Sequence, residues 1–119
     1  MALRLRQVVL DTQDARALAA FYLALTGGSY RPGDEPPIDG SDDADWIVLF
    51  TPDGTRLAFQ KVAQLPRVTW PEGPVLQQLH LDFMVPDAGE LERQRARAVS
   101  LGAEVIEDRS ADPDEALYV

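Results

Sequence analysis

One stretch of this sequence occurs twice, and this internal repeat restricts the possible folds more than any other feature. The segment LRQVVLDTQDARAL (Leu5 to Leu18) aligns with QQLHLDFMVPDAGEL (Gln77 to Leu91) when Asp14 is placed on Asp87, an offset of 73 residues. Each copy reads as an apolar strand, then an aspartate that can cap a helix, then a helical pattern. A chain that repeats one supersecondary unit is expected to form two similar modules.

The first copy predicts a βαβββ unit. Leu3 to Asp11 reads as a strand, and the helix after it ends at Gly27-Gly28, because glycine accepts the left-handed conformation there. A short strand begins at Ser29, and the acidic loop over 32–45 is expected to be solvated and mobile. Two further strands follow, DWIVLF and RLAFQKV.

These two strands are predicted to form a hairpin. Asp53-Gly54 is a favoured centre for a two-residue type I′ turn. That turn sets the expected cross-strand pairs, which are Phe50 with Leu57, Leu49 with Ala58, and Ile47 with Gln60.

The second copy repeats the plan and stops early. Gln78 to Val85 reads as a strand, a helix runs from Asp87 to about Ser100, and AEVIED and ALYV read as short strands. The counterpart of the strand that carries Gln60 would lie beyond Val119. The expected division is module one at 1–65, a proline-containing linker at 66–76, and module two at 77–119 without its last strand.

The order of these elements resembles the vicinal oxygen chelate superfamily, which includes glyoxalase I, bleomycin-resistance proteins and extradiol dioxygenases. Within it, the chain looks like the small bacterial glyoxalase-like domain proteins. The residues that carry the resemblance are QVVLDTQDARALAAFY, DWIVLFTPDGTRLAFQKV and QQLHLDFMVPDAGELERQRARAVSLGAEV, nearly the whole chain. The resemblance implies an α+β fold in which paired βαβββ modules form a curled mixed sheet around a cavity, with the second module incomplete.

The resemblance also implies where a divalent metal would be held, since many members bind one between the first and last strands of each module. It places Gln7 and His80 at first-strand positions and Gln60 at the last-strand position of module one. The fourth position, usually a carboxylate in the catalytic members, lies beyond Val119. His80, Gln7 and Gln60 form a weak metal-ligand set, because two amides and one imidazole bring no negative charge. We therefore expect no resident cofactor and keep a divalent metal as the alternative.

The alternation of the second-copy strand puts His80, the only histidine, on the face opposite the apolar residues. His80 is expected to line a pocket and to hydrogen-bond to Gln7 or Gln60. The predicted hairpin pairing would place the apolar residues Ile47 and Leu49 on the same face as Gln60, where they would line the pocket. The predicted ligand-binding residues are Gln7, Gln60, His80, Ile47 and Leu49, and no catalytic residue is assigned.

Composition excludes several classes of function. The net charge of -9 argues against nucleic acid or an anionic membrane as the partner, because both need basic patches. The absence of cysteine excludes disulfides, thiolate zinc sites and cysteine nucleophiles. No segment reads as a signal peptide or a membrane span, so a cytoplasmic location is predicted.

Three functions stay open at this point. The first is binding of a small, mostly apolar organic molecule, as in the family members that sequester antibiotics. The second is a metal-dependent lyase, isomerase or dioxygenase. The third is a structural or regulatory dimer with a vestigial pocket. A homodimer is expected in each case, because a sheet that lacks its closing strand leaves unpaired backbone groups at its edge.

Overall fold

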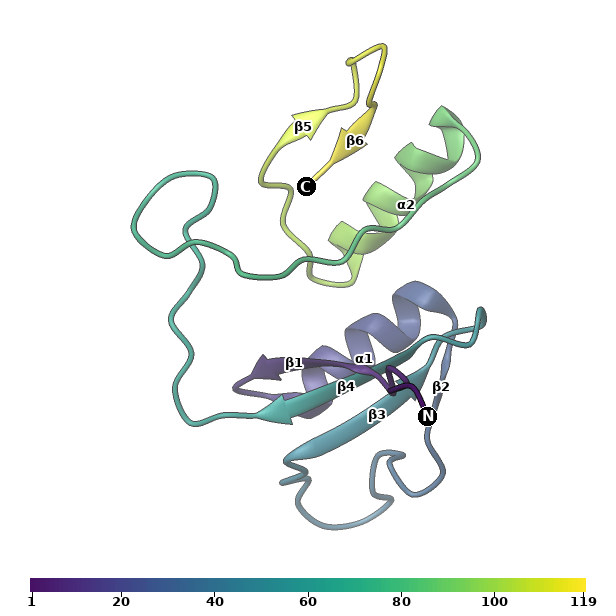
Figure 1. Cartoon of the computed structure of the whole chain (residues 1–119), viewed down its shortest axis with the longest axis vertical. Helices are drawn as coiled ribbons and strands as arrows, with labels where there is room; N and C mark the ends of the chain where they lie inside the picture. The colour runs from purple at the N-terminus through teal and green to yellow at the C-terminus, as the bar shows by residue number, and fades with distance from the viewer. The chain divides into compact units, whose positions relative to one another are not determined.

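The computed structural model describes all 119 residues, and they divide into two compact units, Met1–Val68 and Thr69–Val119 (Figure 1). The division falls inside the expected linker, and the exact module boundaries, 1–65 and 77–119, stay a prediction. Neither helix of the chain is long and apolar enough to cross a membrane.

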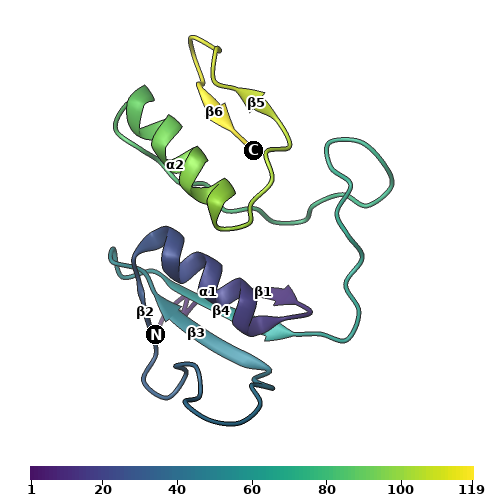
Figure 2. The ribbon, with the colours of Figure 1, turned by 180° about the vertical axis from the view of Figure 1, so that it is seen from behind.

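Unit 1 has the predicted βαβββ order. Its elements are β1 (Val8–Thr12), α1 (Ala15–Thr26), β2 (Ser29–Tyr30), β3 (Trp46–Phe50) and β4 (Arg56–Lys61). They form one mixed four-stranded sheet in the order β1-β4-β3-β2, in which β1 is parallel to β4 and the other pairs are antiparallel. Helix α1 crosses one face of this sheet (Figure 2). The α+β fold class is therefore confirmed.

The ends of α1 follow from local chemistry. The Asp14 side chain accepts a hydrogen bond from the Ala17 backbone N–H at 3.0 Å, which satisfies one of the unpaired donors of the first turn. At the other end Gly27 has a φ of 70° and donates its backbone N–H to the Leu23 carbonyl. A side chain would be strained in that conformation, so glycine is the residue that ends this helix.

The core of unit 1 lies between α1 and the sheet. Ala15 and Ala19 on the helix are fully buried, and their small side chains let the helix approach the strands closely. The Phe59 ring stacks on the Tyr22 ring with centroids 5.8 Å apart, which identifies the helix-covered face of the sheet. Burying each large apolar side chain stabilises the fold by about 2 kcal/mol. The buried strand residues on this face are Ile47, Leu49, Leu57 and Phe59.

The predicted register of the β3–β4 hairpin was wrong by one residue. Ile47 pairs with Phe59 and Leu49 with Leu57. The loop is a three-residue connection: Gly54 donates its N–H to the Thr51 carbonyl, Thr51 donates to Thr55, and Gly54 has a φ of 89°. This is a type I turn followed by a left-handed glycine, not a type I′ turn, and Pro52 suits the first central position of a type I turn.

Side chains close the outer edge of β3, because β2 is only two residues long. Arg31 donates its backbone N–H to the Val48 carbonyl, and the Asp34 carboxylate accepts the Val48 N–H, both at 2.8 Å. The Arg31 guanidinium in turn pairs with Asp34 at 3.0 Å. The Asp34 side chain thus replaces the carbonyl that a longer strand would have supplied.

The acidic loop between β2 and β3 was expected to be mobile, but it is held by Arg16 of α1. Arg16 forms an ion pair with Asp42, donates to the Asp34 carbonyl at 2.7 Å, and lies 5.3 Å from the centre of the Tyr30 ring. Its hydrogen bond is the main reason that the pKa of Asp42 is lowered. One arginine therefore fixes several points of the loop to the helix.

Unit 2 contains α2 (Ala88–Ser100), β5 (Asp108–Arg109) and β6 (Leu117–Tyr118). The Asp87 side chain caps α2 by accepting from the Glu90 N–H at 2.8 Å. The two short strands form an antiparallel pair. The Tyr118 hydroxyl donates a hydrogen bond to the Glu92 carboxylate, which joins the hairpin to the helix and is the largest cause of the raised pKa of Tyr118.

The predicted strand over Gln78 to Val85 does not form, and that prediction was wrong. In unit 1 the corresponding strand, β1, is hydrogen-bonded to β4 alone. Unit 2 contains no counterpart of β4, so this segment has no ladder partner despite its alternating pattern. Its large apolar side chains are left exposed, Leu79 at 55% and Met84 at 94%.

Candidate functional site

The face of the unit 1 sheet opposite α1 carries three rows of side chains from three adjacent strands. Strand register defines the rows, because residues paired across neighbouring strands project to the same side. Alternate residues along a strand share that side, so successive rows lie about 7 Å apart. We call this surface the open face, and its rows run across β1, β4 and β3.

The middle row is apolar and short-chained, and it separates two rows of longer side chains. It consists of Val9, Ala58 and Val48. Ala58 and Val48 are shielded from solvent, whereas Val9 is 38% exposed. An apolar centre with polar groups at its ends is the usual composition of a small-molecule site.

The row at the carboxyl end of β1 combines a carboxylate, an amide and an indole. Asp11 is paired with Gln60, and Gln60 is paired with Trp46. Asp11 and Gln60 are exposed and Trp46 is half-buried. This row can accept hydrogen bonds through the carboxylate, donate and accept through the amide, and offer an aromatic surface.

The row at the opposite end contains Arg56 and Phe50, which are paired across β3 and β4. The Arg56 guanidinium lies over the Phe50 ring, 5.0 Å from its centroid. Gln7 immediately precedes β1, and the β1–β4 register, if continued by one residue, would bring Gln7 next to Arg56. The open face therefore has a cationic end and an anionic end.

Of the predicted site residues, Gln60 belongs to the open face, and Gln7 precedes β1 at the opposite end of that strand. Ile47 and Leu49 do not: both are completely buried on the face covered by α1. The physical reason is the hairpin register, since a shift of one residue moves every side chain of a strand to the other face.

His80 lies in unit 2, in the segment that forms no strand. Its side chain is exposed, and Nε2 lies 3.4 Å from the Asp82 carboxylate, itself 91% exposed. Within unit 2 the imidazole is thus a surface group beside an acid. The predicted hydrogen bond from His80 to Gln7 or Gln60 stays a prediction.

The residues present do not make a metal centre by themselves. No three histidine, aspartate or glutamate side chains of the chain gather closely enough to hold an ion. The open face adds one carboxylate, Asp11, to the two amides of Gln7 and Gln60. Register places Asp11 about two rows, or roughly 13 Å, from Gln7, which is too far for both to reach one ion.

Sequence reasoning missed Asp11 and Arg56. Both could have been found by counting alternate residues: 9 and 11 share a face of β1, and 56, 58 and 60 share a face of β4. The type I′ turn expected at Asp53-Gly54 gave a different hairpin register, which placed Ile47 and Leu49 beside Gln60 instead.

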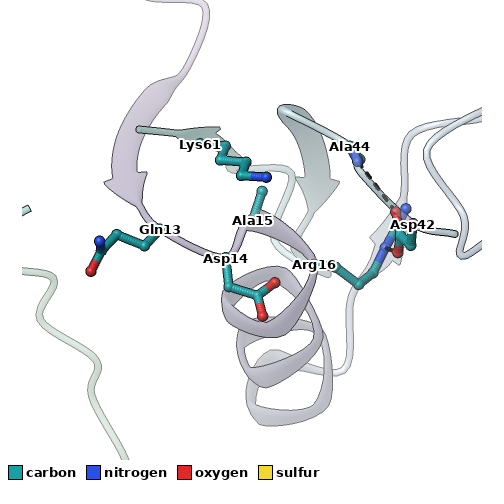
Figure 3. A pocket seen from close by; sticks show the side chains of 7 residues that line it. All are labelled: Gln13, Asp14, Ala15, Arg16, Asp42, Ala44 and Lys61. Carbon is teal, nitrogen blue, oxygen red and sulfur yellow. Dashed lines mark hydrogen bonds and ion pairs between the residues drawn. The ribbon is translucent and has the colours of Figure 1, made fainter. Parts of the chain in front are cut away.

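A small polar cavity of about 200 Å³ lies elsewhere, at the start of α1 (Figure 3). It is lined by Gln13, Asp14, Ala15, Arg16, Asp42, Ala44 and Lys61. Asp14 is committed to capping the helix and Arg16 to holding the acidic loop. This cavity therefore follows from the way in which the loop is attached, and it is separate from the open face.

The profile of the glyoxalase-like domain family matches residues 7–119, and the chain belongs to this family. The match includes the first strand, both helices and the final hairpin. A search among curated proteins found no match.

Solved structures share the fold of this chain. One is a mutant of the fosfomycin resistance protein FosX from Listeria monocytogenes, complexed with Mn(II) and 1S,2S-dihydroxypropylphosphonic acid. It is 17% identical, with a TM-score of 0.62 over 92% of this chain and 75% of its own. A glyoxalase/bleomycin resistance protein/dioxygenase family enzyme from Burkholderia phytofirmans is 21% identical, with a TM-score of 0.58 over 85% and 75%. A glyoxalase/dioxygenase from Nostoc punctiforme is 23% identical, with a TM-score of 0.60 over 87% and 75%. At these identities the likeness concerns the fold.

Proposed function

We propose that this protein binds a small, mostly apolar organic molecule on the open face of unit 1. The observation that carries the proposal is the arrangement of the three rows: an apolar centre lies between two rows of hydrogen-bonding and aromatic groups. Gln7 and Gln60 would orient the ligand from its two ends. The solved relatives include a complex with a small organic molecule, which supports a ligand of similar size.

The experiment is a thermal-shift screen of small organic molecules, followed by titration of each hit. A ligand that binds only the folded protein raises the free energy of unfolding by about 2.7 kcal/mol at 100 times its dissociation constant. Val9→Glu should abolish binding, because it places a charge in the apolar row. Val99→Glu is the matched control, since Val99 is exposed on α2 in unit 2.

Failure of every ligand to raise the melting temperature would contradict the proposal and favour a structural or regulatory role. Binding that survives Val9→Glu would place the site elsewhere in the chain.

A metal-dependent lyase, isomerase or dioxygenase is the second candidate. It is supported by the Mn(II) in the FosX relative. Of the predicted ligands His80, Gln7 and Gln60, the two amides lie about two rows apart, so His80 is the first ligand to test; no three acidic or histidine side chains cluster. Elemental analysis of protein purified without chelator decides the matter. A stoichiometric divalent ion that is lost in His80→Ala would establish this candidate, and metal-free protein would argue against it.

We also propose that the protein acts as a homodimer. The segment before α2 exposes Leu79 and Met84 and forms no strand, so a second copy could cover these two apolar side chains. Sedimentation should show a dimer at tens of micromolar, roughly, and a monomer would contradict the proposal. The cytoplasmic location stays a prediction.

A further inference from the structure

The Arg56 side chain has an unusual environment. It starts β4 on the open face, is half-buried, and lies against the Phe50 ring at 5.0 Å. Its guanidinium takes part in no ion pair and in no side-chain hydrogen bond. The aromatic ring is its one described partner.

Several other arginines of this chain, unlike Arg56, form ion pairs with carboxylates. Carboxylates exceed basic side chains, 20 to 11, so acidic partners are abundant. Five arginines form ion pairs with them, namely Arg16 with Asp42, Arg31 with Asp34, Arg93 with Glu90, Arg95 with Glu92, and Arg109 with Glu107. At the start of β4, by contrast, the half-buried Arg56 has no carboxylate within ion-pair distance.

This environment has a chemical consequence. A cation that is partly removed from water and has no partner costs free energy, which an arriving anion would recover. The Phe50 ring contacts the guanidinium without accepting a hydrogen bond from it, so the N–H donors of Arg56 stay available. Those donors form a planar fork that matches the two oxygens of a carboxylate or a phosphonate.

We propose that Arg56 anchors the anionic group of the ligand, and that the ligand is a small organic oxyanion, a carboxylate or phosphonate with an apolar body. This inference rests on the proposed function and names the ligand class for the same face. Gln7, beside Arg56, would donate a further hydrogen bond to the oxyanion.

The rows set the length and polarity of such a ligand. The apolar body would lie over the middle row at Val9, about 7 Å along the strand from Arg56. The far end would reach Gln60 and Asp11, roughly 13 Å from Arg56. Because Asp11 is a carboxylate, that end of the ligand is neutral or cationic, and a second anionic group there would be rejected.

The test compares matched probes by two-dimensional NMR of the 119-residue chain in a low-salt buffer. Benzoate and benzamide have the same shape and differ in charge, and phenylphosphonate presents the other oxyanion. Benzoate and phenylphosphonate should shift the Arg56 Nε–H and Val9 signals and should bind at least tenfold more tightly than benzamide. The comparison of benzoate with phenylphosphonate tells which oxyanion is preferred.

Variants of Arg56 then test whether its guanidinium binds the oxyanion. Arg56→Met keeps an unbranched apolar stem at this position but removes the charged guanidinium, so it should abolish the preference for benzoate and leave benzamide binding unchanged. Arg56→Lys keeps the charge without the fork and should retain only part of the preference. Arg93→Met, which removes an exposed arginine on α2, is the control and should bind like the wild type.

The outcomes separate this inference from the proposed function. Equal binding of benzoate and benzamide to the open face would overturn the role of Arg56 and leave the proposed function standing. Shifts from none of the three probes at the open face would count against both. If Arg56→Met does not fold, the wild-type comparison of charged and neutral probes still decides.

Discussion

Asp14 and Asp87 cap two helices in the same way, although they lie 73 residues apart in the sequence. Each side chain accepts a hydrogen bond from the backbone N–H three residues later, at 3.0 Å in α1 and 2.8 Å in α2. The repeat read from the sequence is therefore a repeat of local geometry.

The two caps should be worth similar amounts of stability. Asp14→Ala and Asp87→Ala should each lower the free energy of unfolding by about 1 kcal/mol, because each leaves a first-turn N–H without its side-chain acceptor. Urea denaturation monitored by circular dichroism measures the loss. Asp39→Ala, an exposed acid in the loop, is the control, and a loss no larger than the control's would contradict the capping role.

Gly28, between α1 and β2, should not tolerate a side chain. A Cβ there would overlap the backbone carbonyl oxygen of Phe50, which cannot move without disturbing β3. Gly28→Ala should destabilise the protein by about 2 kcal/mol through this overpacking. Gly89→Ala on α2, where the new methyl group stays 3.3 Å or more from its nearest neighbours, Asp87 and Arg93, should cost much less. Equal losses for the two variants would show that the close approach is absent in solution.

The ion pair between Arg16 and Asp42 should make stability depend on acid. The hydrogen bond from Arg16 lowers the pKa of Asp42 below its unfolded value, near 4. The contribution is therefore complete above that unfolded pKa and is lost as the pH falls through the lower folded pKa. Asp42→Asn should be less stable than wild type at pH 7, and the difference should shrink in acid.

Urea midpoints measured from neutral to strongly acidic pH test this, with Asp43→Asn as the control. A difference between Asp42→Asn and wild type that stays constant over the whole range would contradict the ion pair.

Two tyrosines should ionise late. The hydrogen bond to Glu92 raises the pKa of Tyr118, and burial raises that of Tyr22. Because each pKa is raised in the folded protein, the contribution of each neutral tyrosine to the free energy of unfolding is complete below the unfolded pKa. It is lost as the pH rises through the folded pKa. Tyr118→Phe and Tyr22→Phe should each remove one late step from the ultraviolet absorbance titration. A titration in which all three tyrosines ionise together, near the ordinary pKa, would argue against both environments.

The parts of the fold that could be predicted from the sequence depend on local chemistry. The helix caps, the glycine that ends α1 and the βαβββ order follow from residues within a few positions of one another. The strand before α2 could not be predicted in the same way, because alternation describes a side-chain pattern but not the presence of a partner strand.

The candidate site was predicted less well, since it depends on register and long-range contacts. Pro52 and Gly54 select a three-residue turn, and this one difference moved Ile47 and Leu49 beneath α1 and left Arg56 on the open face. The order of the acidic loop depends on Arg16, which is far from it in sequence. No local pattern of acidic residues could reveal that contact.

The Asp34 carboxylate influences which edge of the unit 1 sheet can accept a further strand, because it binds a backbone N–H of β3. An incoming peptide finds the Val48 N–H bound by Asp34 and the Val48 carbonyl bound by Arg31, while the edge of β1 still offers backbone donors and acceptors. Any strand added to unit 1, from a fused tag or from an aggregating chain, would therefore join next to Asp11 and Val9. Fibril formation and ligand binding would then compete for the same end of the molecule.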